Sequence, residues 1–429
     1  MALLDKLLGN LVTRGRLTVV LPSGREQTFG PGGGADLRIR VADRATMLAI
    51  VRDPRLGFGE AYMDGRVTIE RGSLLELMEL IVGGNPWESK SPGRKALNRG
   101  KRWWKALFRR NEVSAARRNV AHHYDIGNDL YRLFLDDDLQ YSCAYYTDPA
   151  NSLEQAQSDK KAHIAAKLAL KSGQRVLDIG CGWGGTALYL HRVAGVDVLG
   201  ITLSEEQLKV ARKRAEEAGV GDRVKFELID YREVEGRFDR IVSIGMFEHV
   251  GAAHYDEFFE RCRGLLEDDG VMLLHTIGKF GKAGKPDGFT DKYIFPGYHL
   301  PSLEQITAAS ARSRLITCDI ETLRLHYAYT LREWLARTNA NRAAIVAMYD
   351  ERFLRMWEYY LAGGVVGFEN GTMCNYQLQY VRNRRALPII RDYMIEDERK
   401  YRAMAGAQGS APRKANAQRK AGSKAKASA

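Results

Sequence analysis

The chain has 429 residues, and its 45% hydrophobic content is enough for one large core and a smaller appended domain. Its formal net charge of +12 favours an anionic partner surface, which phospholipid headgroups or nucleic acid would supply. Five cysteines without a CxxC pair argue against a disulfide framework or a zinc site and favour a reducing, cytoplasmic compartment. Asp5 and Lys6 interrupt the apolar N-terminal residues, so we expect neither a signal peptide nor a spanning helix there.

The first part of the chain predicts a small α+β domain over residues 1–82. Segments 17–21 and 27–30 flank a Pro-Ser-Gly turn, and helices are expected near Arg44 and Ser73. Residues 83–119 are rich in Gly, Pro, Lys and Arg with interleaved aromatic residues, which indicates a linker. Its segment 101–110 fits an interfacial membrane helix or a helix whose tryptophans pack on a neighbouring domain.

Residues 120–404 alternate strands with helices, which predicts an α/β domain built on a parallel sheet. Strands are expected at 175–179, 196–201, 224–229, 238–244 and 270–277, and helices at 186–192, 204–218 and 255–266. The second helix begins with Ser204 as cap and Gln207 at capping-box spacing. Residues 302–391 include an aromatic-rich helical stretch, most of which should pack in the core while some rings line an apolar groove. Residues 405–429 predict a disordered basic tail.

A glycine-rich loop is the most specific local pattern. In VLDIGCGWGG, residues 176–185, an apolar strand ends in an acid and opens into glycines, with a helix to follow. Glycines permit a sharp turn and let the backbone approach a ligand that faces the helix N-terminus. The spacing Gly180-x-Gly182-x-Gly184 is neither GxGxxG nor a P-loop, and it has the form used by S-adenosylmethionine-dependent methyltransferases.

The carboxyl ends of the strands should line one crevice, since ligands of open α/β sheets bind there. Asp230 could accept hydrogen bonds from an adenine amino group, and Tyr231 offers a flat partner for the ring. A nicotinamide enzyme would place an acid after the second strand, where this chain has hydroxyls. Asp178 could alternatively serve only as a strand-end cap. The candidate cofactor-binding residues of this crevice are Asp178, Gly180, Gly182, Trp183, Gly184, Thr202, Leu203, Ser204, Gln207, Asp230, Tyr231 and Arg232.

A second group of candidate residues follows the fourth and fifth strands, at 246–250 and 274–277. Amino-group methyltransferases carry Asn/Asp-Pro-Pro-aromatic after the fourth strand, and this chain has no such sequence, which argues against nitrogen methylation. Glu248 and His275 would place a carboxylate and an imidazole in one pocket, a pairing suited to moving a proton. Alternatively, Glu248 pairs with a basic residue and His275 is a hydrogen-bonded core histidine.

Six motifs in order between residues 121 and 373 resemble the cyclopropane-fatty-acyl-phospholipid synthase family and its mycolic acid cyclopropane synthase relatives. They are AHHYDIGNDL (121–130), LQYSCAY (139–145), the glycine loop, MFEHV (246–250), LHTIG (274–278) and HYAYTL (326–331). The resemblance implies a Rossmann-like class I methyltransferase sheet with helical substrate-binding insertions. The N-terminal module also looks like the extra domain of the bacterial phospholipid enzymes.

The resemblance also implies the site. S-adenosyl-L-methionine would be the co-substrate, with Tyr141 and Ser142 closing over it. The residues expected to hold a bicarbonate ion are Cys143, Glu248, His275, the carbonyl of Ile277, and Tyr327.

The implied reaction is methyl transfer to the cis double bond of an unsaturated acyl chain in a membrane phospholipid, followed by deprotonation that closes a cyclopropane ring. A dry, oriented site would help a weak alkene nucleophile. The faces of Tyr141, Tyr145 and Phe247 could stabilise the carbocation. Bicarbonate would then take the proton and Glu248 would receive it.

Two alternatives remain open for the reaction. A relative could end in a methyl-branched, methylene or otherwise modified chain, although the five bicarbonate residues favour ring closure. From a different class, the basic tail and the Trp/Arg segment could mark a nucleic-acid methyltransferase, against which the motifs argue.

The same resemblance sets the expected partners. We expect acyl chains at the membrane surface and anionic lipid headgroups, no nucleic acid and no metal, and we leave a homodimer open. The enzyme should be cytoplasmic and peripherally bound to the inner face of the membrane.

Overall fold

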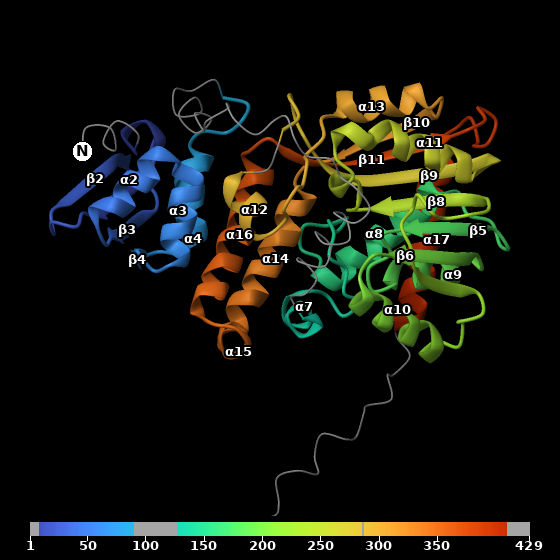
Figure 1. Cartoon of the computed structure of the whole chain (residues 1–429), viewed down its shortest axis with the longest axis horizontal. Coiled ribbons are helices and arrows are strands. Elements are labelled where there is room, and N and C mark those ends of the chain that lie inside the picture. Colours follow the sequence, from blue (N-terminus) through green and yellow to red (C-terminus); the bar gives the residue numbers. More distant parts are fainter. Residues whose placement is uncertain (1–7, 90–126, 285–286, 410–429) are drawn as a thin grey trace, which may run out of the picture.

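The protein is described by a computed structural model over residues 8–89, 127–284 and 287–409. The N-terminal domain lies at one end, a layer of helices in the middle and a large sheet at the other end (Figure 1). No helix within these three ranges is long and apolar enough to cross a membrane. The segment 101–110 and most of the predicted tail lie outside the described residues.

The N-terminal domain is a four-stranded sheet of order β2-β1-β3-β4, covered on one face by helices. β1 pairs antiparallel with β2 and parallel with β3, while β3 pairs antiparallel with β4. Its elements are β1 Gly15–Val20, β2 Glu26–Gly32, β3 Asp36–Val41, α2 Arg44–Arg52, α3 Pro54–Met63, β4 Val67–Arg71, α4 Leu74–Met78 and the π-helix η1 Glu79–Gly83. Asp43 caps α2, and Ser73 forms a capping box with Glu76 at α4. The hairpin and both expected helices are therefore present, with β3, α3 and β4 in addition.

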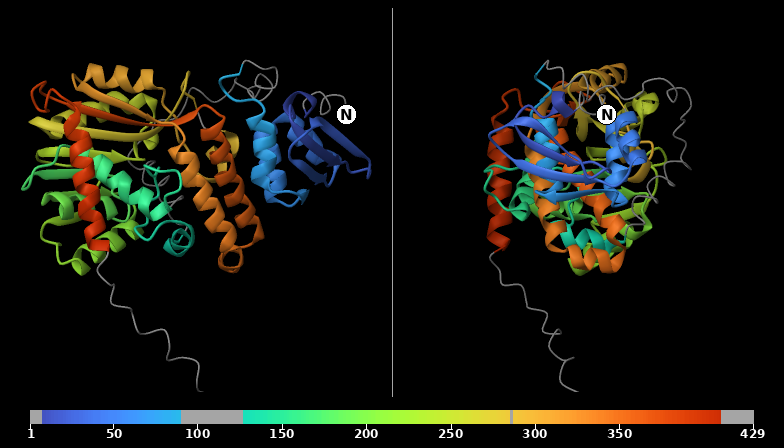
Figure 2. Two further views of the ribbon diagram at one scale, coloured as in Figure 1. Left: turned by 180° about the vertical axis from the view of Figure 1, so that it is seen from behind. Right: turned by 90° about the vertical axis from the view of Figure 1, so that its left-hand side faces the viewer.

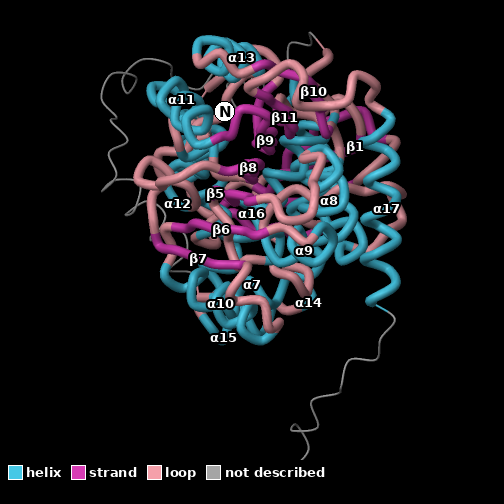
Figure 3. The backbone as a smooth tube through the Cα atoms, turned by 90° about the vertical axis from the view of Figure 1, so that its right-hand side faces the viewer, coloured by secondary structure: helices cyan, strands magenta, loops and turns pink. Residues whose placement is uncertain are grey.

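A seven-stranded sheet of order β10-β11-β9-β8-β5-β6-β7 forms the second body (Figure 3). Strands β5 to β9 are parallel, and β11 lies antiparallel between β9 and β10. The strands are β5 Arg175–Ile179, β6 Asp197–Thr202, β7 Val224–Leu228, β8 Phe238–Ile244, β9 Leu266–Lys279, β10 Ile316–Leu323 and β11 Met373–Val381. This is the predicted α/β sheet, with β9 longer at both ends than expected because it pairs with β8 from Leu266 and with β11 as far as Lys279.

Helices flank this sheet on both faces, as a parallel sheet requires. They are α8 Leu153–Lys167, α9 Gly185–Ala194, α10 Glu205–Glu217, η2 Phe247–His249, η3 Ala252–His254, α11 Tyr255–Leu265, α13 Leu303–Arg312 and α17 Asp392–Gly409. α17 runs along α8 on the outside of the sheet (Figure 2), where the two nitrogens of His163 lie 2.7 Å from Glu398 and Glu321. The domain boundary predicted at residues 404/405 falls inside α17, so this helix continues past the predicted start of the tail.

A helical layer lies between the two sheets. It consists of α7 Asn128–Phe134, α12 Gly288–Tyr293, α14 His326–Ala340, α15 Arg342–Met348 and α16 Glu351–Glu369. Trp334 and Trp357 are fully buried in its core, as expected for most of the aromatic residues. Helices α3 and α4 pack on α16, and Tyr62 of α3 donates a hydrogen bond to Glu358 at 3.0 Å. The layer therefore connects the N-terminal domain to the sheet.

Candidate active site

The glycine loop joins β5 to α9 with a left-handed backbone at every second position. Gly180, Gly182 and Gly184 have φ of +83°, +55° and +80°, a region that side chains disfavour. A methyl group added at Gly182 would have no described atom within 4 Å. The N–H groups of Gly180 and Cys181 both donate to the Ile201 carbonyl at 2.9 Å, which fixes the loop to β6. The loop has the geometry of a ligand cradle.

Asp178 lies at the end of β5, buried at 1% exposure. Its Oδ2 has no hydrogen-bond partner among the residues that the structure describes, and burial raises its pKa to about 7. A buried acceptor without a partner is costly, so this atom suits a ligand that brings a donor. The orphaned oxygen and the open loop beside it fit S-adenosylmethionine, whose ammonium and hydroxyl groups are donors.

Residues after β6 hold one another in place. The Thr202 hydroxyl donates to Gln207 Oε1 at 3.1 Å and accepts from the Ser204 N–H at 3.1 Å. Ser204 caps α10 by accepting from the Gln207 N–H at 3.3 Å. The Gln207 side chain faces Thr202, so the expected capping box is formed on one side only. Leu203 lies between these residues and is partly exposed.

Residues after β7 form a compact ion pair. Asp230 accepts from the Arg232 N–H, Nε and Nη2 at 3.0, 2.8 and 2.8 Å. The Arg232 guanidinium lies 5.4 Å from the centre of the Tyr231 ring. The edge of that ring packs against Phe258, with centroids 5.3 Å apart. Contact of Asp230 with adenine stays a prediction. An adenine amino group would donate to those lone pairs of the Asp230 carboxylate that do not accept from Arg232.

A buried lysine organises the Tyr-Ser-Cys segment. Lys160 on α8 is 0% exposed, and its Nζ donates to Gln140 Oε1 at 2.6 Å and to Ser142 Oγ at 2.9 Å. Burial lowers its pKa to about 7, against the opposing charge of Asp136. The sequence analysis missed Lys160, because a charged residue within a charged helix is usually solvated and its partners lie about twenty residues away in the chain.

The other two residues of this segment face the helical layer. The Tyr141 hydroxyl lies 3.2 Å from that of Tyr360, and its ring stacks on Trp334 with centroids 5.1 Å apart. Cys143 is 1% exposed and donates to the Ala144 carbonyl at 3.3 Å. Burial raises the pKa of the Cys143 thiol, which keeps it protonated. Trp183 of the glycine loop donates from Nε1 to Asn128 at 2.8 Å, also in this layer.

Glu248 is an enclosed carboxyl group on η2, the short helix that follows β8. It is 1% exposed, and its Oε1 accepts from the Ile277 N–H at 2.5 Å. Its Oε2 has no partner within residues 8–89, 127–284 and 287–409. Burial raises its pKa to about 7. The alternative in which Glu248 pairs with a basic residue is therefore not observed.

His275 is held by two side-chain amides of β11. Its Nε2 lies 2.5 Å from Asn375 Nδ2, and its Nδ1 lies 3.1 Å from Gln377 Nε2. Burial pushes its pKa well below the usual value, so the ring is neutral. A neutral ring donates at one nitrogen and accepts at the other, so one amide presents its oxygen and the other its N–H. This is the core-histidine alternative, and its contact with a bicarbonate ion stays a prediction.

Tyr327 and Ile277 lie together on the wall of a cavity, which Tyr298 and Tyr360 also line. The sequence analysis did not identify Tyr298, which no motif distinguishes. Tyr327 packs edge-on to Trp334 with centroids 5.8 Å apart. These three tyrosines therefore line the cavity, whereas the rings expected to face a carbocation are Tyr141, Tyr145 and Phe247.

Phe247 and Tyr145 have their faces covered, contrary to that expectation. Phe247 is 0% exposed and stacks on Tyr255, with centroids 4.2 Å apart, in the core of the sheet domain. Tyr145 is stacked between His163 and His326, with centroids 4.1 and 4.9 Å away. Both rings therefore pack within the protein rather than offer a face to a substrate.

Residues 111–378 match the model of a family described as mycolic acid cyclopropane synthetase, over more than half of the chain. The chain belongs to the mycolic acid cyclopropane synthetase family. Residues 3–85 match a second family, described only as a domain of unknown function. This cyclopropane synthetase family member therefore combines the family's catalytic domain with an N-terminal domain whose family has no assigned function.

Relatives support the same family. The chain is 41% identical to the cyclopropane-fatty-acyl-phospholipid synthase of Escherichia coli strain K12, over 77% of this chain and 84% of the relative. It is 33% identical to the tuberculostearic acid methyltransferase of Mycobacterium tuberculosis, over 89% of this chain and 91% of the relative.

A solved structure supports the fold. That of a mycolic acid cyclopropane synthase complexed with SAH and CTAB has a TM-score of 0.59 and 34% identity, over 62% of this chain and 97% of the other. The family member is accordingly an S-adenosylmethionine-dependent methyltransferase with a class I fold.

Proposed function

We propose that the chain is a cyclopropane-fatty-acyl-phospholipid synthase, which transfers a methylene unit from S-adenosylmethionine to the cis double bond of an unsaturated phospholipid acyl chain. The observation that carries the proposal is the enclosed Glu248. Its Oε2 has no hydrogen-bond partner among the described residues, and its Oε1 accepts from the N–H of Ile277, which lines the apolar cavity together with Tyr327. Methyl transfer to an alkene needs a proton acceptor before the ring can close, and an apolar wall suits the hydrocarbon chain that carries the alkene.

Binding of the two substrates comes first. S-adenosylmethionine supplies the methyl group, and the glycine loop and Asp178 would hold it. Lys160 positions Ser142 through its hydrogen bond and so shapes the segment expected to close over the co-substrate. The apolar wall holds the alkene without water, and orientation and dryness both lower the barrier for this weak nucleophile.

Methyl transfer leaves a positive charge on the neighbouring acyl carbon. The rings of Tyr298, Tyr327 and Tyr360 would stabilise it through their faces. Burial raises the pKa of Tyr298 and of Tyr141 well above the usual value. Both therefore remain neutral phenols, which cannot trap the cation as a phenolate would.

Loss of a proton from the new methyl group then closes the ring, because its C–H electrons form the second bond to the cationic carbon. Glu248, with a pKa near 7, would receive that proton. The residues present fit a small oxyanion, since Glu248 Oε2 could accept from a protonated one. Cys143, Glu248, His275, Ile277 and Tyr327 would hold bicarbonate, which would supply a base.

The proposed setting is the cytoplasmic face of a membrane. The net charge of +12 supports contact with anionic headgroups. The proposed partners are phospholipid acyl chains at that surface, with a second copy of the chain as a further candidate.

Expression in a host without its own synthase tests the function. Mass spectrometry of the phospholipid fatty acids should show a gain of one methylene with loss of alkene reactivity. An unchanged fatty-acid profile in cells that contain the folded protein would refute the proposal.

A methyl-branched product is the second candidate, because the relative covered over 91% of its length is named a tuberculostearic acid methyltransferase. A saturated methyl-branched chain would be two hydrogen atoms heavier than the cyclopropane chain, because a separate hydride donor would have to reduce the carbocation instead of a base removing a proton. The same mass spectra therefore separate the two products.

A further inference from the structure

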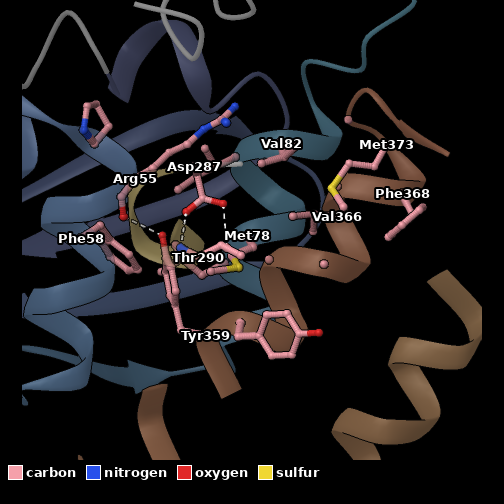
Figure 4. A pocket seen from close by; sticks show the side chains of 18 of the residues that line it. Arg55, Phe58, Met78, Val82, Asp287, Thr290, Tyr359, Val366, Phe368 and Met373 are labelled. Carbon is pink, nitrogen blue, oxygen red and sulfur yellow. Dashed lines mark hydrogen bonds between the residues drawn. The ribbon is translucent and has the colours of Figure 1, made fainter. Parts of the chain in front are cut away.

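A cavity of about 380 Å³ extends from the active site into the N-terminal domain (Figure 4). This volume is within the range of small-ligand sites. At one end it is lined by Ile277 and Tyr327. At the other it reaches apolar side chains on the inner face of the N-terminal sheet, namely Leu17, Val19, Ile39 and Val41. The cavity therefore belongs to both domains.

The lining shows which kind of ligand the cavity suits. Asp287 accepts hydrogen bonds from the N–H groups of Phe289 and Thr290, and the Tyr359 hydroxyl donates to the Arg55 carbonyl at 2.8 Å (Figure 4). These polar groups therefore form hydrogen bonds within the protein. Most of the remaining lining is aliphatic or aromatic, which favours a hydrocarbon chain and penalises an ester or a headgroup.

Ion pairs fix the N-terminal domain against the helical layer. Arg352 of α16 lies 2.9 Å from Asp64, and Lys292 of α12 lies 2.6 Å from Glu60. The Tyr293 hydroxyl also donates to Glu60 at 2.9 Å. These contacts hold the N-terminal wall of the cavity in place against the helical layer.

We propose that this cavity binds the methyl-terminal part of the acyl chain beyond the reacting double bond, with the N-terminal domain as its closed end. This inference rests on the proposed function and gives the domain of unknown function a role. Since the alkene must lie at the active site, the depth of the cavity then determines which double-bond positions react. The polar ester and headgroup remain on the other side of the double bond.

Gly363 on α16 allows the cavity to be shortened. It lines the cavity, and a methyl group added there would meet no described atom within 4 Å. Gly363→Leu should therefore place its side chain in the cavity without a clash. Gly264→Leu on α11 is the matched control, because Gly264 is exposed, lies outside the lining and also has open space.

Phe58 on α3 allows the opposite change from the N-terminal domain. Its ring lines the cavity and is half-buried, 6.1 Å from the ring of Tyr359. Phe58→Ala should lengthen the cavity.

The readout is the ratio of kcat/KM for detergent-dispersed phospholipids with oleoyl or vaccenoyl chains. These isomers differ in double-bond position, and the vaccenoyl chain has two fewer carbons on the methyl side. Gly363→Leu should shift the ratio toward vaccenoyl by about 10-fold or more, since each methylene in an apolar pocket discriminates at that level. Phe58→Ala should shift it toward oleoyl, and Gly264→Leu should leave it unchanged.

An unchanged ratio in both cavity variants overturns the proposal, even if total turnover falls. A shift in the reverse direction also overturns it, because the carboxyl side of the chain would then occupy the cavity.

A binding measurement separates this inference from the proposed function. Calorimetry with lysophosphatidylglycerols of increasing chain length, without co-substrate, should show affinity that rises with length in the unsubstituted protein and about 10-fold weaker binding in Gly363→Leu. That result supports the cavity even if no cyclopropane product forms. Equal affinity in both proteins overturns it, even if product forms.

Discussion

Burial changes the acid–base behaviour of three side chains in the site. Asp178 and Glu248 have pKa values raised to about 7, and Lys160 has its pKa lowered to about 7. The common cause is loss of water around the charged form. Groups with pKa values near neutral can gain or lose a proton during turnover, which is what the proposed ring closure requires.

Removing the Glu248 carboxylate should abolish most product formation. Glu248→Gln keeps the size and the hydrogen bond from Ile277 but cannot accept a proton, so kcat should fall by about 10²-fold or more. Calorimetry should show nearly unchanged affinity for S-adenosylmethionine, because Glu248 is placed at the proton site. Parallel losses of binding and turnover would assign Glu248 to the co-substrate instead.

The pH dependence should follow the same carboxyl. Because burial raises the pKa of Glu248 to about 7, this group becomes protonated below that pH, where an exposed glutamate stays ionised. The proposed role needs the ionised form, so kcat at saturating S-adenosylmethionine should decrease as the pH is lowered through about 7. A kcat that stays flat from about pH 6 to about pH 8 would contradict this role.

At the scale of elements, the sequence pattern predicted those strands whose bounds are determined by neighbouring residues in the chain. β5 and β8 have the predicted bounds because each strand is a short apolar run that ends at a glycine or polar turn. β10 and β11 were not predicted, since β11 pairs with β9, about a hundred residues earlier in the chain, and β10 pairs with β11, about sixty residues later. The sequence could not decide between the two roles of His275 for the same reason, because its partners Asn375 and Gln377 come from β11.

The glycine loop offers a test at this scale. Gly182→Val should block S-adenosylmethionine, since its branched side chain would enter the cradle and strain a backbone at φ +55° by about 1–3 kcal/mol. The fold should survive, because the added atoms meet open space. Circular dichroism and calorimetry would check both statements. Normal co-substrate binding in a folded variant would show that the loop is not the cradle.

For the whole molecule, the main difference from the sequence analysis concerns the N-terminal domain. Its sequence contains no recognisable catalytic or binding motif. Its contribution to the cavity depends on its packing against α16, which brings Phe58 and the inner face of its sheet to the cavity. No local pattern encodes that contact. The class I sheet, in contrast, was predictable because the glycine loop and strand alternation are local signals.

Membrane docking by segment 101–110 stays a prediction, since it lies outside the described residues. The cations Lys101, Arg102, Lys105, Arg109 and Arg110 should each contribute about 1 kcal/mol near an anionic surface. Neutralising all five should reduce liposome co-sedimentation and activity on vesicles more than activity on detergent-dispersed lipid. Salt-insensitive vesicle binding, unchanged by these substitutions, would indicate a helix that packs on a neighbouring domain.

The central claim is that a transferred methyl group loses one proton within this site. The most direct test gives the purified protein S-adenosylmethionine with a trideuterated methyl group and a monounsaturated phospholipid, and measures the product by mass spectrometry. Ring closure after deprotonation predicts a product that retains two deuterium atoms and lacks an alkene. A product that retains all three deuterium atoms, or a lipid without label, would contradict the account.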